Sequence, residues 1–285
     1  MKRLLKSLSI ISTVLLVSSC SKDSTNEDSI GQVENLTPKS TVNFDQFGIS
    51  HNLAMDYVGN APNFNQMTKH DIYRYIQGYS DHYFLYDDAD TNWVAHKARV
   101  SLGIDLANDP ANAAHLLLDR GIISSNQYGL IDSLFTIFDD AADYNAQTYL
   151  SIKDFNSRVK LLEDHILLNY NVVYNVQTDE LNYAGGMLAA CSIMKASYEY
   201  WRNAVTNSSH PWHTKRTTNF EDPNDNLQKS LFRGIWRGIK VGAVDTGVFI
   251  VSLFGDCNRG TGNGAGILGS GSCACGAAGE ASSGV

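Results

Sequence analysis

Two histidines stand close together in a polar part of the sequence, in the run His210-Pro-Trp-His213. Imidazole nitrogens bind zinc, and catalytic zinc sites commonly add a carboxylate, which Glu221 or Asp222 could supply here. His210 and His213 are therefore the candidate ligands of a metal-dependent hydrolase. The simpler interpretation is a pair of solvent-facing loop histidines, because the sequence contains no His-Glu-x-x-His motif and no serine-hydrolase motif.

A second polar cluster, His51, Asn52 and Asp56, falls in the first segment with helical periodicity. The spacing of a helix places Asn52 and Asp56 on one face and His51 slightly off it. This arrangement favours a helix cap and a hydrogen bond in the core over a catalytic base, and no residue is assigned a catalytic role.

Three cysteines lie in the glycine-rich C-terminal segment, at Cys257, Cys273 and Cys275. A disulfide from Cys257 to either Cys273 or Cys275 would close a glycine-rich loop. A soft metal bound by the three thiolates is the alternative, but zinc sites usually leave two or more residues between paired cysteines. Cys191 differs from these three, since it lies on an apolar helical stripe, and we expect it to be a buried free thiol.

The fifth cysteine, Cys20, follows a segment with the order of an export signal. Lys2, Arg3 and Lys6 precede an apolar run of about a dozen residues, which is too short to span a bilayer of roughly 30 Å. The run ends in Leu16-Val-Ser-Ser-Cys20. This ending resembles the lipobox of bacterial lipoproteins, and the resemblance covers the first twenty residues only.

The resemblance implies that residues 1–19 are a signal peptide and that Cys20 becomes the acylated first residue of the mature chain. One acyl chain binds a membrane only marginally, whereas several anchor a protein stably. Ser21 stands where inner-membrane lipoproteins of Gram-negative bacteria commonly carry Asp, so the resemblance points to the outer membrane. The covalent lipid, a palmitate-type modification, would be the only attached group, and no separate cofactor is expected.

The net charge argues against nucleic acid as a partner. The whole chain carries −8, and removal of the three cations of the signal leaves the mature chain at −11. A protein that binds nucleic acid usually presents a basic surface instead. The partners we expect are the membrane, through the lipid anchor, and an envelope protein or glycan.

Apolar residues recur with helical periodicity along most of the mature chain, and this predicts an all-α, bundle-like single domain. Thr68 with Asp71 and Ser151 with Asp154 have the spacing of helix caps. Residues 20–42 are polar, which predicts a flexible tether. Residues 43–254 are expected to form the helical domain, with a polar loop at 205–226. Residues 255–285 form a Gly/Ser/Cys-rich tail. The longest helix is expected to start near Thr178 and to bury a face of seven residues. These are Leu181, Ala184, Leu188, Cys191, Met194, Tyr198 and Trp201.

The segment from Leu231 to Phe254 contains Gly234, Gly238 and Gly242 at intervals of four residues. A glycine inside a helix costs roughly 1 kcal/mol relative to alanine, so three on one face predict a close helix–helix contact that offsets the cost. The favoured interpretation is a central helix packed inside the bundle. The alternative is a helix that inserts into a target membrane, as in a contact toxin, or that pairs with another chain.

Together these patterns predict a membrane-anchored envelope lipoprotein with a helical, non-catalytic binding or structural domain. A membrane-active protein using residues 231–254 and a metal-dependent hydrolase are the two alternatives.

Overall fold

The computed structural model describes residues 42–81, 89–175, 180–213 and 227–254. It confirms the predicted all-α class, with eight α-helices and two very short hairpins in these ranges. The helices are α1 (Asp45–Gly59), α2 (Lys69–Asp81), α3 (Ala89–Asn108), α4 (Ala113–Asp119), α5 (Ser125–Asp139), α6 (Ile152–Asn169), α7 (Tyr183–Thr206) and α9 (Leu227–Phe254). Short 3-10 turns occupy Phe64–Gln66 and Pro110–Asn112.

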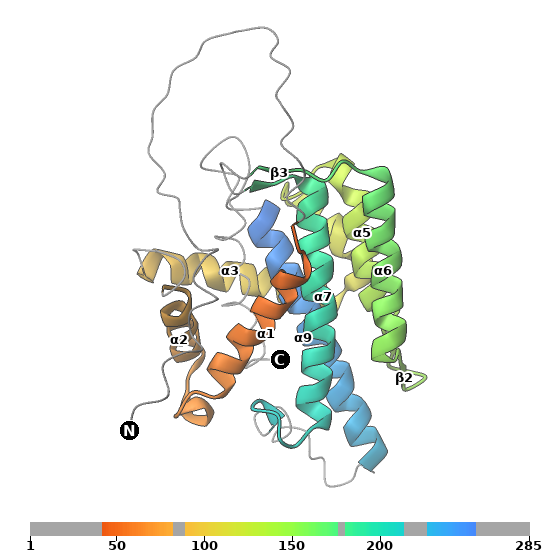
Figure 1. Cartoon of the computed structure of the whole chain (residues 1–285). Coiled ribbons are helices and arrows are strands. Elements are labelled where there is room, and N and C mark those ends of the chain that lie inside the picture. The colour runs from red at the N-terminus through yellow and green to blue at the C-terminus, as the bar shows by residue number, and fades with distance from the viewer. Residues whose placement is uncertain (1–41, 82–88, 176–179, 214–226, 255–285) are drawn as a thin grey trace, which may run out of the picture. The chain divides into compact units, whose positions relative to one another are not determined.

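The two hairpins are antiparallel pairs of two-residue strands. β1 (Ala142–Asp143) pairs with β2 (Thr148–Tyr149), and β3 (Tyr174–Asn175) pairs with β4 (Glu180–Leu181). The first hairpin connects α5 to α6, and the second lies between α6 and α7. They sit near opposite ends of α6 (Figure 1).

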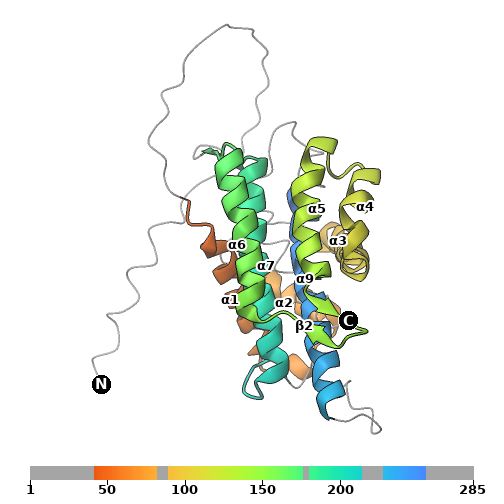
Figure 2. The same ribbon diagram turned by 90° about the vertical axis from the view of Figure 1, so that its right-hand side faces the viewer.

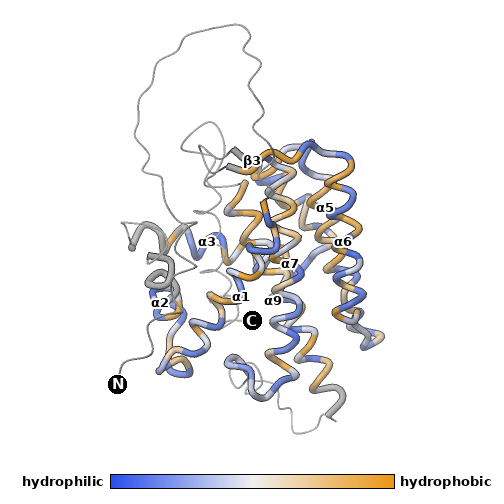
Figure 3. Tube along the Cα trace, viewed as in Figure 1, coloured by the Kyte–Doolittle hydropathy of each residue, from blue (hydrophilic) through white to orange (hydrophobic). Residues whose placement is uncertain are grey.

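Helix α7 is the centre of the domain, because α9, α1 and α6 all pack against it. Figures 1 and 2 show α1 and α6 on two sides of α7, with α9 running beside it. Helix α3 crosses α9 and packs against it. Apolar positions recur along the helices of the bundle (Figure 3).

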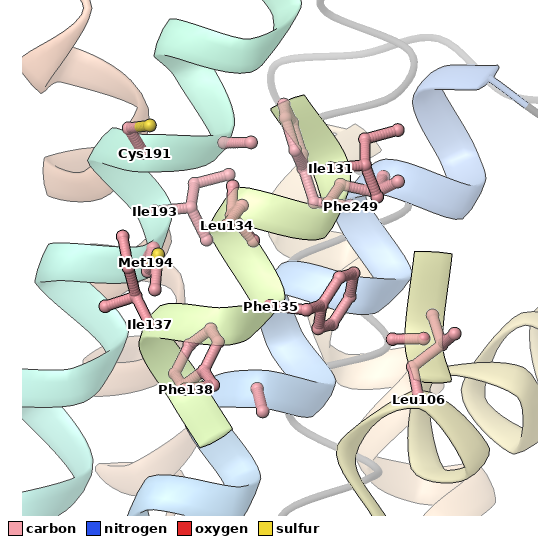
Figure 4. Packing of buried hydrophobic residues seen from close by; sticks show 14 of the residues in the cluster. Leu106, Ile131, Leu134, Phe135, Ile137, Phe138, Cys191, Ile193, Met194 and Phe249 are labelled. Atoms are coloured by element: carbon pink, nitrogen blue, oxygen red, sulfur yellow. The ribbon is translucent and has the colours of Figure 1, made fainter. Parts of the chain in front are cut away.

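The main core lies between α5, α7, α9 and their neighbours (Figure 4). Phe155 of α6 stacks on Tyr198 of α7 with ring centroids 3.6 Å apart, and Phe138 of α5 packs against Phe155. Cys191 is fully buried, and this burial raises the pKa of its thiol. A thiol held neutral in this way is a poor nucleophile.

The predicted core face of α7 is buried, but α7 begins at Tyr183 rather than near Thr178. The prediction that this helix is the longest is wrong, because α7 has 24 residues and α9 has 28. The side chain of Asn182 accepts a hydrogen bond from the backbone N–H of Gly185 at 3.0 Å and so caps the helix. Leu181 therefore lies in strand β4, one residue before the cap. Both predicted capping pairs form, with Asp71 N 3.2 Å from Thr68 Oγ1 and Asp154 N 3.0 Å from Ser151 Oγ.

Helix α1 turns a different face inward from the one that its apolar spacing predicts. Ile49, Leu53 and Tyr57 form the apolar stripe in the sequence, yet they are 47%, 53% and 39% exposed. The inward face carries Gly48 and His51, with Gly48 so close to α7 that an added Cβ would lie 2.6 Å from the carbonyl oxygen of Ser192. The same face buries Ala54, Met55 and Val58, so apolar packing, a close backbone contact and a buried polar side chain together orient this helix.

The three regularly spaced glycines of α9 face α7. A Cβ added at Gly238 would lie 3.0 Å from the carbonyl oxygen of Trp201, and one at Gly234 would lie 2.5 Å from Cγ1 of Val205. At Gly242 the nearest atom would be at 3.5 Å, which is an ordinary contact. Among the described residues, no helix combines the length and the apolar character that crossing a membrane requires.

Candidate functional site

The polar groups at the centre of the domain converge on one carboxylate, that of Asp245 in α9. His51 Nε2 of α1 lies 3.1 Å from Asp245 Oδ2, and Trp201 Nε1 of α7 donates to the same oxygen at 2.6 Å. The hydroxyl of Ser197, one turn before Trp201, also donates to Oδ2. All four side chains are almost completely buried. One carboxylate oxygen therefore joins α1, α7 and α9.

Both ring nitrogens of His51 lie within hydrogen-bond distance of an oxygen in this cluster. Its second nitrogen, Nδ1, lies 3.0 Å from Asn52 Oδ1, so both ring nitrogens face acceptor oxygens, as they do in an imidazolium. Burial disfavours the charged ring, but the hydrogen bond and charge of Asp245 outweigh it and hold the pKa of His51 above 6.5. The Asp245 carboxylate thus favours the charged form of the buried imidazole.

This cluster does not have the geometry of a nucleophilic triad. In a Ser-His-Asp triad the histidine bonds the serine hydroxyl and can remove its proton. Here Ser197 donates to the aspartate instead, and both Ser197 and His51 use the same oxygen. The cluster holds three helices together, which agrees with the core hydrogen bond that the sequence suggests for His51. Asp56, the third member of that predicted cluster, accepts instead from the hydroxyl of Tyr200 at 2.9 Å.

The candidate metal ligands His210 and His213 are both engaged with their own segment. His210 Nδ1 accepts from the backbone N–H of Trp212 at 3.3 Å, and burial lowers the pKa of His210. His213 Nδ1 lies 3.0 Å from the carbonyl oxygen of Ala204. Within the described ranges, no group of three or more His, Cys, Asp or Glu residues gathers to hold a metal. Glu221 and Asp222 lie outside those ranges.

Four further predicted site residues also lie outside the described residues. They are Cys20, Cys257, Cys273 and Cys275.

The most distinctive feature on the surface of the domain is a cluster of aromatic and cationic side chains that we call the aromatic surface. It comprises Tyr144, Tyr149, Arg202, Phe232, Trp236 and Lys240. The ring of Tyr144 lies 5.1 Å from that of Trp236 and 5.9 Å from that of Phe232, while Tyr149 stacks on Phe232 at 6.3 Å. The hairpin β1–β2 thus packs onto α9 through aromatic rings.

Hydrogen bonds within the turn of the hairpin fix the position of Tyr144. Asp143 Oδ1 accepts from the backbone N–H groups of Asn145 and Ala146 at 2.8 and 2.9 Å, which fixes the turn. Gln147 completes the turn with φ of 54°. Tyr144 and Tyr149 are 52% and 39% exposed, so each ring packs on one side and meets solvent on the other.

Two cations border these rings. Arg202 of α7 lies over Tyr149, 4.8 Å from the ring centroid, and donates to the carbonyl oxygen of Leu150 at 2.8 Å. Lys240 lies 4.1 Å from the centroid of Trp236 and donates to Asn108 Oδ1 at 2.9 Å. Partial burial lowers the pKa of Lys240. These contacts order two flexible side chains beside the aromatic rings.

Sequence reasoning did not find the aromatic surface. Its members come from three separate parts of the chain, and none stands in a motif. The sequence does contain one indication of this surface, because Trp236 falls on the polar side of α9, opposite the side that carries the three glycines. A large indole ring in that position must pack either against other side chains of the same protein or against a binding partner.

A shallow depression of about 510 Å³ lies at another place, between the turn after α1 and helix α2. Asn63, Gln66, Met67, Asp71, Arg74 and Tyr75 line it. Asp71 is the one carboxylate among these lining residues, and it already caps α2.

No protein-family model, no curated protein and no solved structure matches this chain.

Proposed function

We propose that the protein is a lipid-anchored envelope lipoprotein whose helical domain binds an envelope protein through the aromatic surface. The anchor rests on the lipobox-like ending at Cys20. The binding role rests on one observation, the exposed rings of Tyr144 and Tyr149 ordered by Trp236 and Arg202.

The residue types of this surface support a protein partner. Trp, Tyr and Arg are the side chains that contribute most to binding in protein interfaces, and Tyr and Trp lose little conformational freedom when they are buried. Here the rings are held in place before any partner arrives, which reduces the entropic cost of binding. The cations favour a partner with acidic groups at the matching positions.

The anchor and the binding surface are tested separately. The intact mass of the protein purified from membranes should correspond to a chain that starts at Cys20 and carries acyl chains. A chain that keeps residues 1–19, or that is cleaved elsewhere without lipid, would refute the anchor.

The binding role is tested by cross-linking the full lipoprotein in its native envelope and recovering it. A specific protein should be recovered with the wild type and lost, by roughly tenfold or more, with Tyr144→Ala. Val94→Ala on α3 is the matched control, because Val94 is 65% exposed and lies outside the aromatic surface. Equal recovery with both variants, or recovery of glycan alone, would contradict the proposal.

The two alternative functions stay predictions. A contact toxin would have to release α9 from α7, and a hydrolase would need metal ligands in addition to His210 and His213.

A further inference from the structure

Exposed apolar side chains gather on the outer side of α6 and just after its end. Leu161, Leu167 and Leu168 are 70%, 58% and 84% exposed, and Tyr170 and Val173 follow just beyond the end of the helix. These five residues, which we call the α6 leucine patch, account for five of the twelve large apolar side chains that are exposed in the described ranges. A concentration of this kind marks a surface that meets a partner or a membrane.

The charges around the patch are balanced. Lys160 pairs with Asp164 at 2.9 Å on α6, and Lys195 of α7 pairs with Glu163 at 2.8 Å. Lys160 and Asp164 lie on the same side of α6 as the leucines and neutralise each other, so the patch carries no net charge. This favours the acyl region of a lipid layer over an anionic head group or a charged protein.

The domain begins beside this patch. Lys195, the partner of Glu163 on α6, also lies 3.7 Å from Asp45, the first residue of α1. The chain from Cys20 therefore enters the domain next to α6. The 24 residues between Cys20 and Asp45 span at most about 80 Å when fully extended. A lipid on Cys20 would thus keep the patch at a high local concentration near the bilayer.

From these observations we infer that the α6 leucine patch rests on the membrane to which the chain is anchored; the inference depends on the proposed lipid anchor. The leucines enter the boundary between head groups and acyl chains, and Tyr170 lies at the level of the head groups. The patch alone is too small to hold the protein on a bilayer, and the anchor supplies the remaining affinity.

The leucine patch is separate from the aromatic surface. Helix α6 begins three residues after strand β2 and ends next to the β3–β4 hairpin (Figures 1 and 2). Its 18 residues span about 27 Å. The aromatic surface lies near the start of α6 and most of the leucine patch near its end, so the two surfaces are separate and both can be occupied at once.

Hydroxyl-radical footprinting of the full-length lipidated protein, reconstituted in phosphatidylethanolamine–phosphatidylcholine vesicles, tests the inference. The reference is the full chain with Cys20→Ala in buffer without vesicles. Oxidation of Leu167 and Leu168 should fall about fivefold or more on the vesicles, because these side chains leave water. Oxidation of Leu53 and Val94, which are exposed on α1 and α3, should stay unchanged.

A double variant, Leu161→Ser with Leu168→Ser, should restore the oxidation of Leu167 and Tyr170 on vesicles to the reference level. Leu53→Ser is the matched control and should leave the protection intact. Protection already present in the reference without vesicles would show that a second copy covers the patch, and it would overturn the inference. The inference would also be overturned if the lipidated protein stays on the vesicles but Leu167 and Leu168 are oxidised as fully as in the reference. That result would leave the proposed lipid anchor intact.

Discussion

His51 Nε2 and Asp245 Oδ2 lie 3.1 Å apart in the core although 194 residues separate them in the chain. The pair joins the first helix of the domain to its last described helix, and Trp201 and Ser197 attach the central helix to the same oxygen. The other carboxylate oxygen, Asp245 Oδ1, is buried and makes no hydrogen bond within the described residues. The cluster is therefore sensitive to any change in its charges.

Removal of the carboxylate should destabilise the domain strongly. Asp245→Ala leaves a buried imidazole and an indole N–H without their acceptor, and breaking a buried ion pair costs about 3–5 kcal/mol. The free energy of unfolding, measured by denaturant titration, gives the result. Asp164→Ala is the control, because it removes an aspartate from a pair at the surface and should change the stability far less. Equal effects of the two substitutions would contradict the account of the core.

Stability should fall as the pH rises above 6.5. Since the pKa of His51 is raised in the folded protein, the folded state holds a proton that the unfolded state has lost. The stabilisation is complete below pH 6.5 and disappears as the pH passes the folded-state pKa. His51→Gln should be less stable at low pH and should lose this decline with pH. If the stability of the variant declines with pH by the same amount, the decline comes from another titrating group and the account of His51 is wrong.

The glycines of α9 should respond unequally to alanine. Gly238→Ala places a methyl group 3.0 Å from a backbone oxygen of α7, so the helices must separate and the protein should lose about 1–3 kcal/mol of stability. Gly242→Ala meets only ordinary contacts and should be neutral or stabilising by up to about 1 kcal/mol. Thermal unfolding of the two variants provides the comparison. Equal losses of stability would contradict this account, because they would show that the distance from each glycine to α7 does not determine the cost of alanine.

Local patterns predicted much of the fold. The cap at Ser151 and the buried face from Ala184 to Trp201 depend on neighbours within a few turns of one helix, and this information is present in the sequence. The start of α7 was placed too early because an apolar residue in a strand, Leu181, continues the helical period by coincidence.

Long-range contacts were beyond the reach of these patterns. The apolar stripe of Ile49, Leu53 and Tyr57 indicates a buried face, but α1 turns the opposite face inward, where His51 meets Asp245 and Gly48 lies against α7. Asp245 itself interrupts an apolar run in the sequence and gives no sign of its partners. The aromatic surface escaped prediction for the same reason, since a hairpin and α9 form it from distant segments.

The central claim is that the aromatic surface binds an envelope protein, and photo-cross-linking in living cells tests it most directly. A photoreactive amino acid at position 144 of the full chain should give a covalent adduct with one protein, whereas the same group at position 94 should give little or none. Trp236→Ala, which removes the ring beneath Tyr144, should weaken the adduct at position 144 by roughly tenfold. Adducts of equal yield at positions 144 and 94, or none with protein at position 144, would contradict the claim.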